Sequence, residues 1–282
     1  MSKKDSFIHN FAKHKLAVVA FFILALEILV VVIAPGVLGL DPITSDTAAF
    51  GSPPGAVHLL GTDDVGRDLL ARLLSGGRVS MLIGLGATLV SVAVGLPLGL
   101  VAGYYRGKAE TLIMRTADIF LSFPSIVLNL VIVAVFGSSV QLLIVTIGVL
   151  HWPAVAKLIY GNVLSVRSRE FVEAERAIGS SDAKIIFKTV LPNSIAPLWV
   201  SLAFRISNAM LTESALSFLG AGVQPPQASW GNIIQAANNL TVLTSRWWQW
   251  IPAGLCLMLT IVCLNFVGEG VRDALDPKMK RL

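Results

Sequence analysis

The sequence predicts an all-α, polytopic membrane protein with six transmembrane helices, both termini in the cytoplasm and short helices in a cytoplasmic connection. Hydrophobic residues make up 55% of the 282 residues, charged residues only 14%, and the mean hydropathy is +0.75. A soluble domain carries about 25% charged residues, so this composition favours a protein that resides in lipid. A helix needs roughly 20 residues to cross a bilayer, and six apolar stretches come close to that length or exceed it.

The six stretches are separated by polar segments or by segments that contain Gly and Pro. They cover residues 16–34, 79–102, 119–136, 140–156, 195–219 and 250–267. The third, fourth and sixth stretches are short, and we expect them to extend into their flanks. A cleaved signal peptide is the alternative for the first stretch. Its length and the poor cleavage sequence Ala34-Pro35-Gly36 favour a helix that stays in the protein.

The basic residues set the orientation of this topology. An even number of crossings places both termini on one side, and the side richer in Lys and Arg is cytoplasmic. Sixteen of the 22 Lys and Arg lie on the side that holds the termini and the connections that follow the second and fourth helices. The outer segments contain only Arg67, Arg72, Arg78 and Arg246. The net charge of +5 therefore reflects topology and needs no nucleic-acid partner.

This topology divides the chain into four segments. These are a cytoplasmic segment 1–15, a first helix with its outer connection 16–78, a five-helix core 79–270 that includes the connection 167–192, and a cytoplasmic tail 271–282. No phosphate-binding loop occurs, since Gly107-Lys108 is followed by Ala109 and lacks the upstream glycine. Hydrolase motifs are also missing, and the four histidines are dispersed. We expect no catalysis, metal or bound cofactor in this chain.

The connection 167–192 is predicted to form two short helices at an angle. Residues 168–178 contain good helix formers, with apolar residues among charged neighbours, which predicts a surface helix. Gly179 would end that helix, and Ser180 or Ser181 would cap a second helix that starts at Asp182 and runs to Pro192. A half-apolar helix outside the membrane favours a partner protein. A solvated connection is the alternative.

A polar stripe marks the fifth helix. Ser201, Arg205, Asn208 and Thr212 recur at helical spacing and fall within about 60° of one another. Polar groups in lipid are costly and usually face a cavity or another helix, so we expect the stripe to border a pathway or a partner subunit. Hydrogen bonding between helices is the alternative. Glu213 is a further candidate pathway residue, and Glu213 and Glu27 are candidate counter-charges for Arg205.

Two glycine-containing segments have structural interpretations. Gly95, Gly99 and Gly103 repeat every four residues on the second helix, which predicts close helix packing.

In the outer connection, Thr62 or Asp63 is predicted to cap an amphipathic helix that ends at Gly76-Gly77 and lies over the outer mouth. The alternative for this connection is a metal site. Its ligands would be His58, Asp63, Asp64 and Asp68.

Several motifs resemble those of one transporter family. The connection 167–192 is similar to the coupling loop of ABC importer permeases, and the other motifs narrow the resemblance to permeases for dipeptides, oligopeptides and nickel. This chain differs from the family pattern at Glu175, where Ala is usual, and at Thr189, where an aliphatic residue is usual. The similar residues of the loop are Glu173, Ala174, Glu175, Gly179, Leu191 and Pro192. The outer motif is Gly61, Thr62, Asp63, Gly66, Arg67 and Asp68, and the later motifs are 215–220, Pro225-Pro226, Trp230-Gly231 and 273–277.

The resemblance implies a multi-pass permease of a bacterial-type inner membrane, the second of two different permeases that enclose one pathway. It also implies two ATPase subunits that bind ATP and Mg²⁺, an external substrate-binding protein, and alternating access driven by ATP. Short peptides are the implied substrate, with nickel or glutathione as alternatives. An autonomous channel, an ion-coupled carrier and an assembly scaffold are alternatives from other classes.

Overall fold

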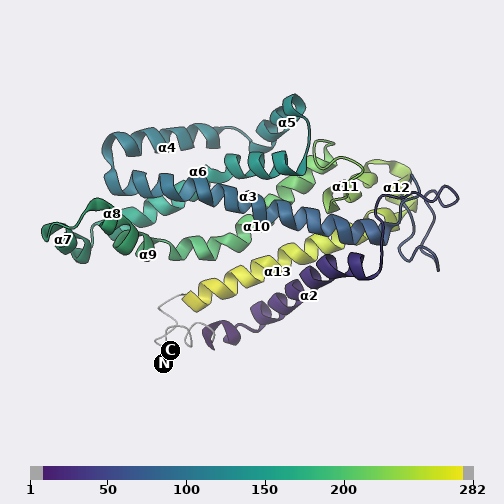
Figure 1. Ribbon diagram of the computed structural model, residues 1–282, viewed down its shortest axis with the longest axis horizontal. Helices are drawn as coiled ribbons and strands as arrows, with labels where there is room; N and C mark the ends of the chain where they lie inside the picture. Colours follow the sequence, from purple (N-terminus) through teal and green to yellow (C-terminus); the bar gives the residue numbers. More distant parts are fainter. Residues whose placement is uncertain (1–8, 276–282) are drawn as a thin grey trace.

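The computed structural model describes residues 9–275, which are largely helical and form only two isolated β-bridges. Most of the long helices run in roughly one direction, whereas α5 turns away from α4 by 83° (Figure 1). They are α2 (Lys15–Val37), α3 (Leu69–Tyr105), α4 (Gly107–Ser122), α5 (Ser125–Phe136), α6 (Val140–Arg167), α10 (Ala196–Phe218) and α13 (Ile251–Leu275). Short elements are α7 (Glu170–Ala177), α8 (Asp182–Lys184), π-helix η1 (Ile185–Val190), α9 (Leu191–Ser194), α11 (Trp230–Ile234), 3₁₀-helix η2 (Gln235–Asn238), α12 (Leu240–Ser245) and 3₁₀-helix η3 (Trp247–Gln249).

Four helices in the described residues are long and apolar enough to cross a membrane: α2, α3, α6 and α13. Two bent pairs raise the number to six if each counts as one crossing, namely α4 with α5 at 83° and 182–194 with α10 at 59°. The six predicted crossings agree with that count. The prediction of one continuous helix over 119–136 is wrong, because Pro124 lacks an N–H and forces Phe123 into an extended conformation (φ −100°, ψ 142°).

The predicted amphipathic helix before the second crossing is also wrong. α3 begins at Leu69, where Asp68 accepts a hydrogen bond from the N–H of Ala71 (2.8 Å), and continues through Gly76-Gly77. The two glycines serve packing, since a Cβ on Gly77 would lie 2.7 Å from Trp230 Cζ2. With 37 residues, α3 is about 55 Å long and exceeds the hydrocarbon core of roughly 30 Å.

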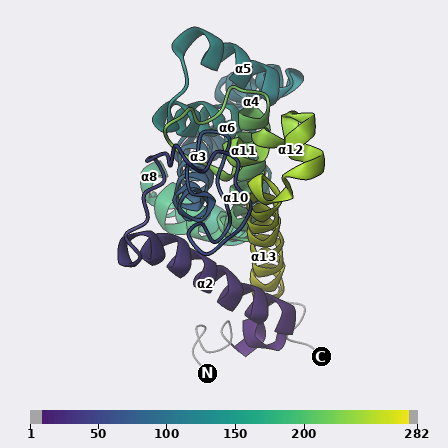
Figure 2. The ribbon, with the colours of Figure 1, turned by 90° about the vertical axis from the view of Figure 1, so that its right-hand side faces the viewer.

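α3 and α6 pack against each other along a seam of small residues. A Cβ on Gly99 would lie 2.6 Å from the Ala156 carbonyl oxygen and 2.8 Å from Ile159 Cβ, and Gly95 and Gly103 approach α6 equally closely. This confirms the predicted close packing. α13 contacts both α2 and α10, and α2 lies at the edge of the bundle (Figure 2).

The connections gather at the two ends of the bundle. α7, α8 and α9 lie at the end that also holds the start of α2 and the last described turn of α13 (Figure 1). The segment that joins α2 to α3 lies at the other end with α12. This alternation agrees with the predicted order of crossings. Residues 1–8 and 276–282 lie outside the described residues, and with them most of the two predicted cytoplasmic ends and the end of the 273–277 motif.

Candidate functional site

The connection between α6 and α10 folds as two angled helices. α7 ends before Gly179, whose φ of +77° closes the turn, and the N–H of Ser180 donates to the Glu175 carbonyl oxygen at 3.1 Å. A second helix starts at Asp182, as predicted, but neither Ser180 nor Ser181 makes the capping bond. It also continues past Pro192 to Ser194. Pro192 has no N–H to donate, and the turns before it widen into the π-helix η1.

One face of this connection is anchored in the bundle. Val172, Ile185 and Val190 are buried in one cluster with residues of α3 and α6. The hydroxyl of Tyr104, at the end of α3, donates to the Asp182 carboxylate at 2.6 Å. We call residues 167–194 the coupling segment. Its apolar side is thus packed against two long helices.

The coupling segment also exposes apolar side chains. Phe171 is 47% exposed, Phe187 is 64% exposed and Ile178 is 78% exposed. We call these three residues the docking patch. They stand on a segment beyond the ends of the long helices, among charged neighbours. An apolar patch with a polar rim is typical of a protein interface.

The two residues that differ from the family pattern contact each other. The hydroxyl of Thr189 on η1 donates to Glu175 Oε1 on α7 at 2.7 Å. Sequence reasoning missed this pairing because the two positions are distant along the chain. Of the other predicted coupling residues, Glu173, Ala174 and Pro192 are exposed, while Leu191 packs against the buried cluster.

An open cavity of about 390 Å³ lies between α3, α5, α6 and α10, and several polar side chains line it. Three residues of the predicted stripe line it, namely Arg205, Asn208 and Thr212. Ser201 adjoins it by accepting a hydrogen bond from Arg205 Nε at 3.2 Å. Sequence reasoning missed the polar residues that other helices contribute, since only the fold brings them together. These are Thr88, Ser91, Ser125 and His151.

Glu213 lies outside this cavity and is fully buried. Its carboxylate accepts hydrogen bonds from Ser217 (2.7 Å), Ser229 (2.8 Å) and Ser80 (3.2 Å), and these serines belong to α10, the start of α11 and α3. Among the described residues, neither Glu213 nor Glu27 forms an ion pair with Arg205. Glu213 therefore holds helices together at a site of its own.

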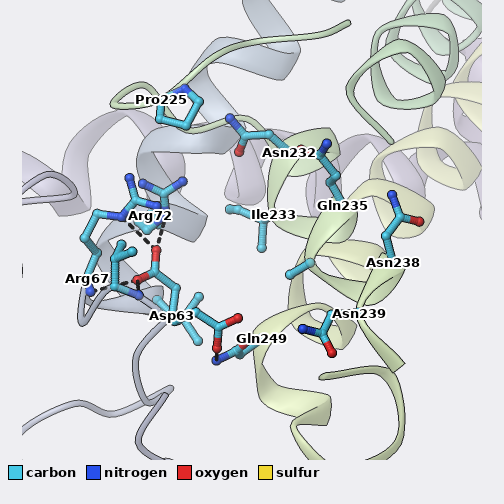
Figure 3. Close-up of a pocket in the computed structure, with 14 residues that line it drawn as sticks. Asp63, Arg67, Arg72, Pro225, Asn232, Ile233, Gln235, Asn238, Asn239 and Gln249 are labelled. Carbon is cyan, nitrogen blue, oxygen red and sulfur yellow. Dashed lines mark hydrogen bonds and ion pairs between the residues drawn. The ribbon is translucent and has the colours of Figure 1, made fainter. Parts of the chain in front are cut away.

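The outer motif builds a compact loop beside a second pocket of about 390 Å³ (Figure 3). Asp63 lies between Arg67 (2.7 Å) and the buried Arg72 (3.4 Å). Gly61 and Gly66 have φ of +75° and +82°, and a Cβ on Gly66 would lie 2.2 Å from the Asp46 carbonyl oxygen. Thr62 is buried and accepts from the N–H of Ser52. Carboxamide side chains line the facing wall: Asn232, Gln235, Asn238, Asn239 and Gln249.

Among the described residues, only one of the three acidic residues of the alternative metal site, Asp68, contacts His58. His58 Nδ1 lies 2.8 Å from Asp68, and His58 Nε2 lies 3.5 Å from Asp46. The hydrogen bond to Asp68 raises the pKa of His58. Within residues 9–275 there is no group of three His, Cys, Asp or Glu side chains that could hold a metal ion. His58 is an ion-pair partner here.

A bundle of apolar helices with an open cavity that polar side chains border, and with an exposed segment beyond the helix ends, is typical of polytopic transport subunits. Residues 95–281 match the family of binding-protein-dependent transport system inner membrane components. Residues 5–54 match the N-terminal transmembrane domain of oligopeptide transport permease C. The chain belongs to the family of binding-protein-dependent inner membrane components, and is a multi-pass permease subunit of the ABC transporter type.

Named relatives are similar over nearly the whole chain. The di/tripeptide transport system permease protein DppC of Pseudomonas aeruginosa is 38% identical over 285 residues, which cover 99% of this chain and 93% of DppC. A protein of Brucella suis biovar 1 whose name describes it as a peptide permease is 37% identical over 96% of this chain and 89% of its own length. A chain of the MetNI methionine ABC transporter, solved in inward-facing conformations, has a TM-score of 0.60 at 18% identity. That structural match covers 73% of this chain and 97% of the MetNI chain, and it supports the fold.

Proposed function

We propose that this chain is one of two different permeases of an ATP-driven importer of short peptides. Two ATPase subunits bind ATP and Mg²⁺ at its cytoplasmic end, and an external binding protein delivers the peptide at the other end. The names of the relatives support peptides as the substrate class. The basic residues at the end that carries the coupling segment support the orientation.

The docking patch carries this proposal. Phe171, Ile178 and Phe187 are exposed on a segment whose other face is buried against α3 and α6. A groove on an ATPase subunit would cover these side chains and remove their apolar surface from water. A solvated connection gives no reason for three large exposed apolar side chains in so short a segment.

The chain connects the docking patch to the cavity through α10. The second helix of the coupling segment meets α10 at a bend of 59°. α10 carries Arg205, Asn208 and Thr212 at the cavity. Movement of the ATPase subunits would therefore reorient the helix that lines the pathway, and alternating access follows from that movement.

Co-purification of the complex tests the proposal. The tagged chain is expressed with its partner subunits and extracted in mild detergent, and the ATPase subunits are expected to co-purify. Phe187→Asp places a charge in the docking patch and is expected to release them. Leu240→Asp is the matched control, because Leu240 is 73% exposed on α12 at the opposite end.

The proposal fails if the chain remains alone under conditions that preserve a known ABC complex. It also fails if Phe187→Asp and Leu240→Asp retain the ATPase subunits equally well. Transport by the chain reconstituted alone, without dependence on ATP, would favour the carrier or channel instead. ATP-dependent uptake of nickel or glutathione that peptides do not inhibit would show that one of these, and not a short peptide, is the substrate.

A further inference from the structure

Arg205 is a cation in a membrane helix without a counter-charge in the part of this chain that the structure describes. Its Nε donates to the Ser201 hydroxyl and one terminal nitrogen donates to the Ala154 carbonyl oxygen, each at 3.2 Å. Both partners are neutral. A guanidinium has five N–H donors, so three remain. Within residues 9–275 no carboxylate lines the cavity that Arg205 borders.

The geometry holds Arg205 in place for a ligand. The Ser201 hydroxyl donates to the Leu198 carbonyl oxygen at 2.9 Å, which leaves its oxygen free to accept from Arg205 Nε. The second bond ties the guanidinium to α6. Ser201 is therefore a positioning residue. A buried or half-buried cation is stabilised by an anion that reaches its remaining donors.

The other polar groups of the cavity offer acceptors. The hydroxyls of Thr88, Ser91 and Thr212 each donate to a carbonyl oxygen of their own helix at 2.8 Å. Their oxygens keep accepting capacity. The cavity thus combines one unpaired cation with hydroxyl acceptors. This suits a ligand that has both a carboxylate and N–H donors, as a peptide does.

We infer that the cavity between α3, α5, α6 and α10 is a binding site for the transported peptide, and that Arg205 binds one of its carboxylates. In an unmodified peptide this is the C-terminal carboxylate or an acidic side chain. The inference rests on the proposed function for its substrate class. It adds to that function the residue that binds the peptide, the peptide group that is bound and the location of the site.

Protection of an introduced cysteine tests this site directly. Asn208 is exposed and lines the cavity, so Asn208→Cys reports on its occupancy. The background replaces the two native cysteines, Cys256 and Cys263, by Ser. The assembled importer in nanodiscs reacts with a neutral thiol reagent without peptide, or with trialanine, trialanine amide or Ala-Glu-Ala amide.

We expect trialanine to slow the labelling several-fold and trialanine amide to have little effect. Arg205→Gln is expected to weaken trialanine protection by at least about tenfold in the half-protecting concentration, as for loss of a charge-assisted bond. Lys157→Gln is the matched control, because Lys157 pairs with Asp118 at 2.6 Å outside this cavity. Size-exclusion chromatography checks that each variant assembles.

The peptide set distinguishes the two carboxylate sources. Protection by trialanine alone assigns the site to the C-terminal carboxylate, and protection by Ala-Glu-Ala amide as well assigns it to either carboxylate. Equal protection by trialanine and its amide, no protection by any peptide, or protection that Arg205→Gln leaves unchanged would each overturn the inference. ATP-dependent peptide uptake is measured in parallel with the binding protein present. Absence of uptake refutes the proposed function, whereas uptake with carboxylate-independent protection refutes only this site.

Discussion

The hydrogen bond from Thr189 to Glu175 joins the two coupling residues that differ from the family pattern. Thr189 is buried, and its hydroxyl is the donor to Glu175 Oε1. Replacing one partner leaves the other without its bond, at a cost of about 1–3 kcal/mol. Replacing both by apolar residues is expected to cost less than the sum of the single changes.

A double-mutant cycle measures this pair. We expect Glu175→Ala and Thr189→Ile each to lower the thermal unfolding midpoint of the purified complex. The double variant is expected to recover part of the loss. Additive losses in the double variant would show that the two side chains do not stabilise each other.

The His58 pair predicts a pH dependence at the opposite end of the molecule. Contact with Asp68 raises the pKa of His58 above its ordinary value of 6.5. The stabilisation is therefore complete below the unfolded-state pKa and is lost as pH rises through the folded-state pKa. We therefore compare the hydrogen exchange of residues 41–68 at pH about 5.5 and about 8.5, each corrected for the intrinsic exchange rate at that pH. We expect stronger protection at the acidic pH.

The matched variant for this prediction is His58→Gln. It keeps a polar side chain of similar size but has no charge to lose in this range. We expect the difference in protection between the wild type and His58→Gln to be largest at the acidic pH and to shrink as pH rises. A difference that grows towards alkaline pH would contradict the assigned ion pair.

At the scale of elements, Gly179 sets the angle between α7 and α8. Its φ of +77° lies in the region that glycine favours, and a Cβ at this position would have no neighbouring atom within 4 Å. A β-branched residue there costs about 1–3 kcal/mol in backbone strain without a clash. We expect Gly179→Val to insert and assemble normally but to lose uptake, because the two helices change their angle.

Gly179→Asn is the control, since Asn tolerates the left-handed region better than Val does. It is expected to retain most of the uptake. Uptake of the Val variant at the wild-type rate would show that the angle between these helices does not govern coupling.

The seam between α3 and α6 depends on the absence of side chains. A Cβ on Gly99 would lie 2.6 Å from the Ala156 carbonyl oxygen. Gly99→Val is expected to destabilise the protein by about 1–3 kcal/mol through overpacking. Gly161→Val makes the same change on α6 where no atom lies within 4 Å. The thermal unfolding midpoint of each variant is measured, and Gly99→Val is expected to have the lower one. Equal midpoints would contradict the close packing of α3 and α6.

At the scale of the whole molecule, the alternation of connections between two ends predicts their accessibility. Thr47 lies in the segment between α2 and α3, and Ser168 lies at the start of the coupling segment, and both are exposed. In a background without native cysteines, we expect an impermeant maleimide to label Thr47→Cys in intact spheroplasts. Ser168→Cys is expected to react only after permeabilisation. The reverse pattern would invert the proposed orientation.

Most of the architecture could be predicted from the sequence. The apolar stretches locate α2, α3, α6, α10 and α13, because crossing a bilayer requires a continuous apolar helix. Gly179 and Asp182 mark the break in the coupling segment, because capping and left-handed turns depend on local chemistry. Pro124 also indicates a helix break by its local chemistry. The apolar residues on both sides of it instead favoured one continuous helix.

The sequence by itself thus determined the class of protein, the order of its apolar stretches and the position of its coupling segment, since these depend on local composition and spacing. Only the tertiary structure decided which polar residues share a site. It places His151 at the cavity of Arg205. It also surrounds the Glu213 carboxylate with three serine donors and pairs Thr189 with Glu175. These contacts join distant parts of the chain, and helix packing in three dimensions selects them.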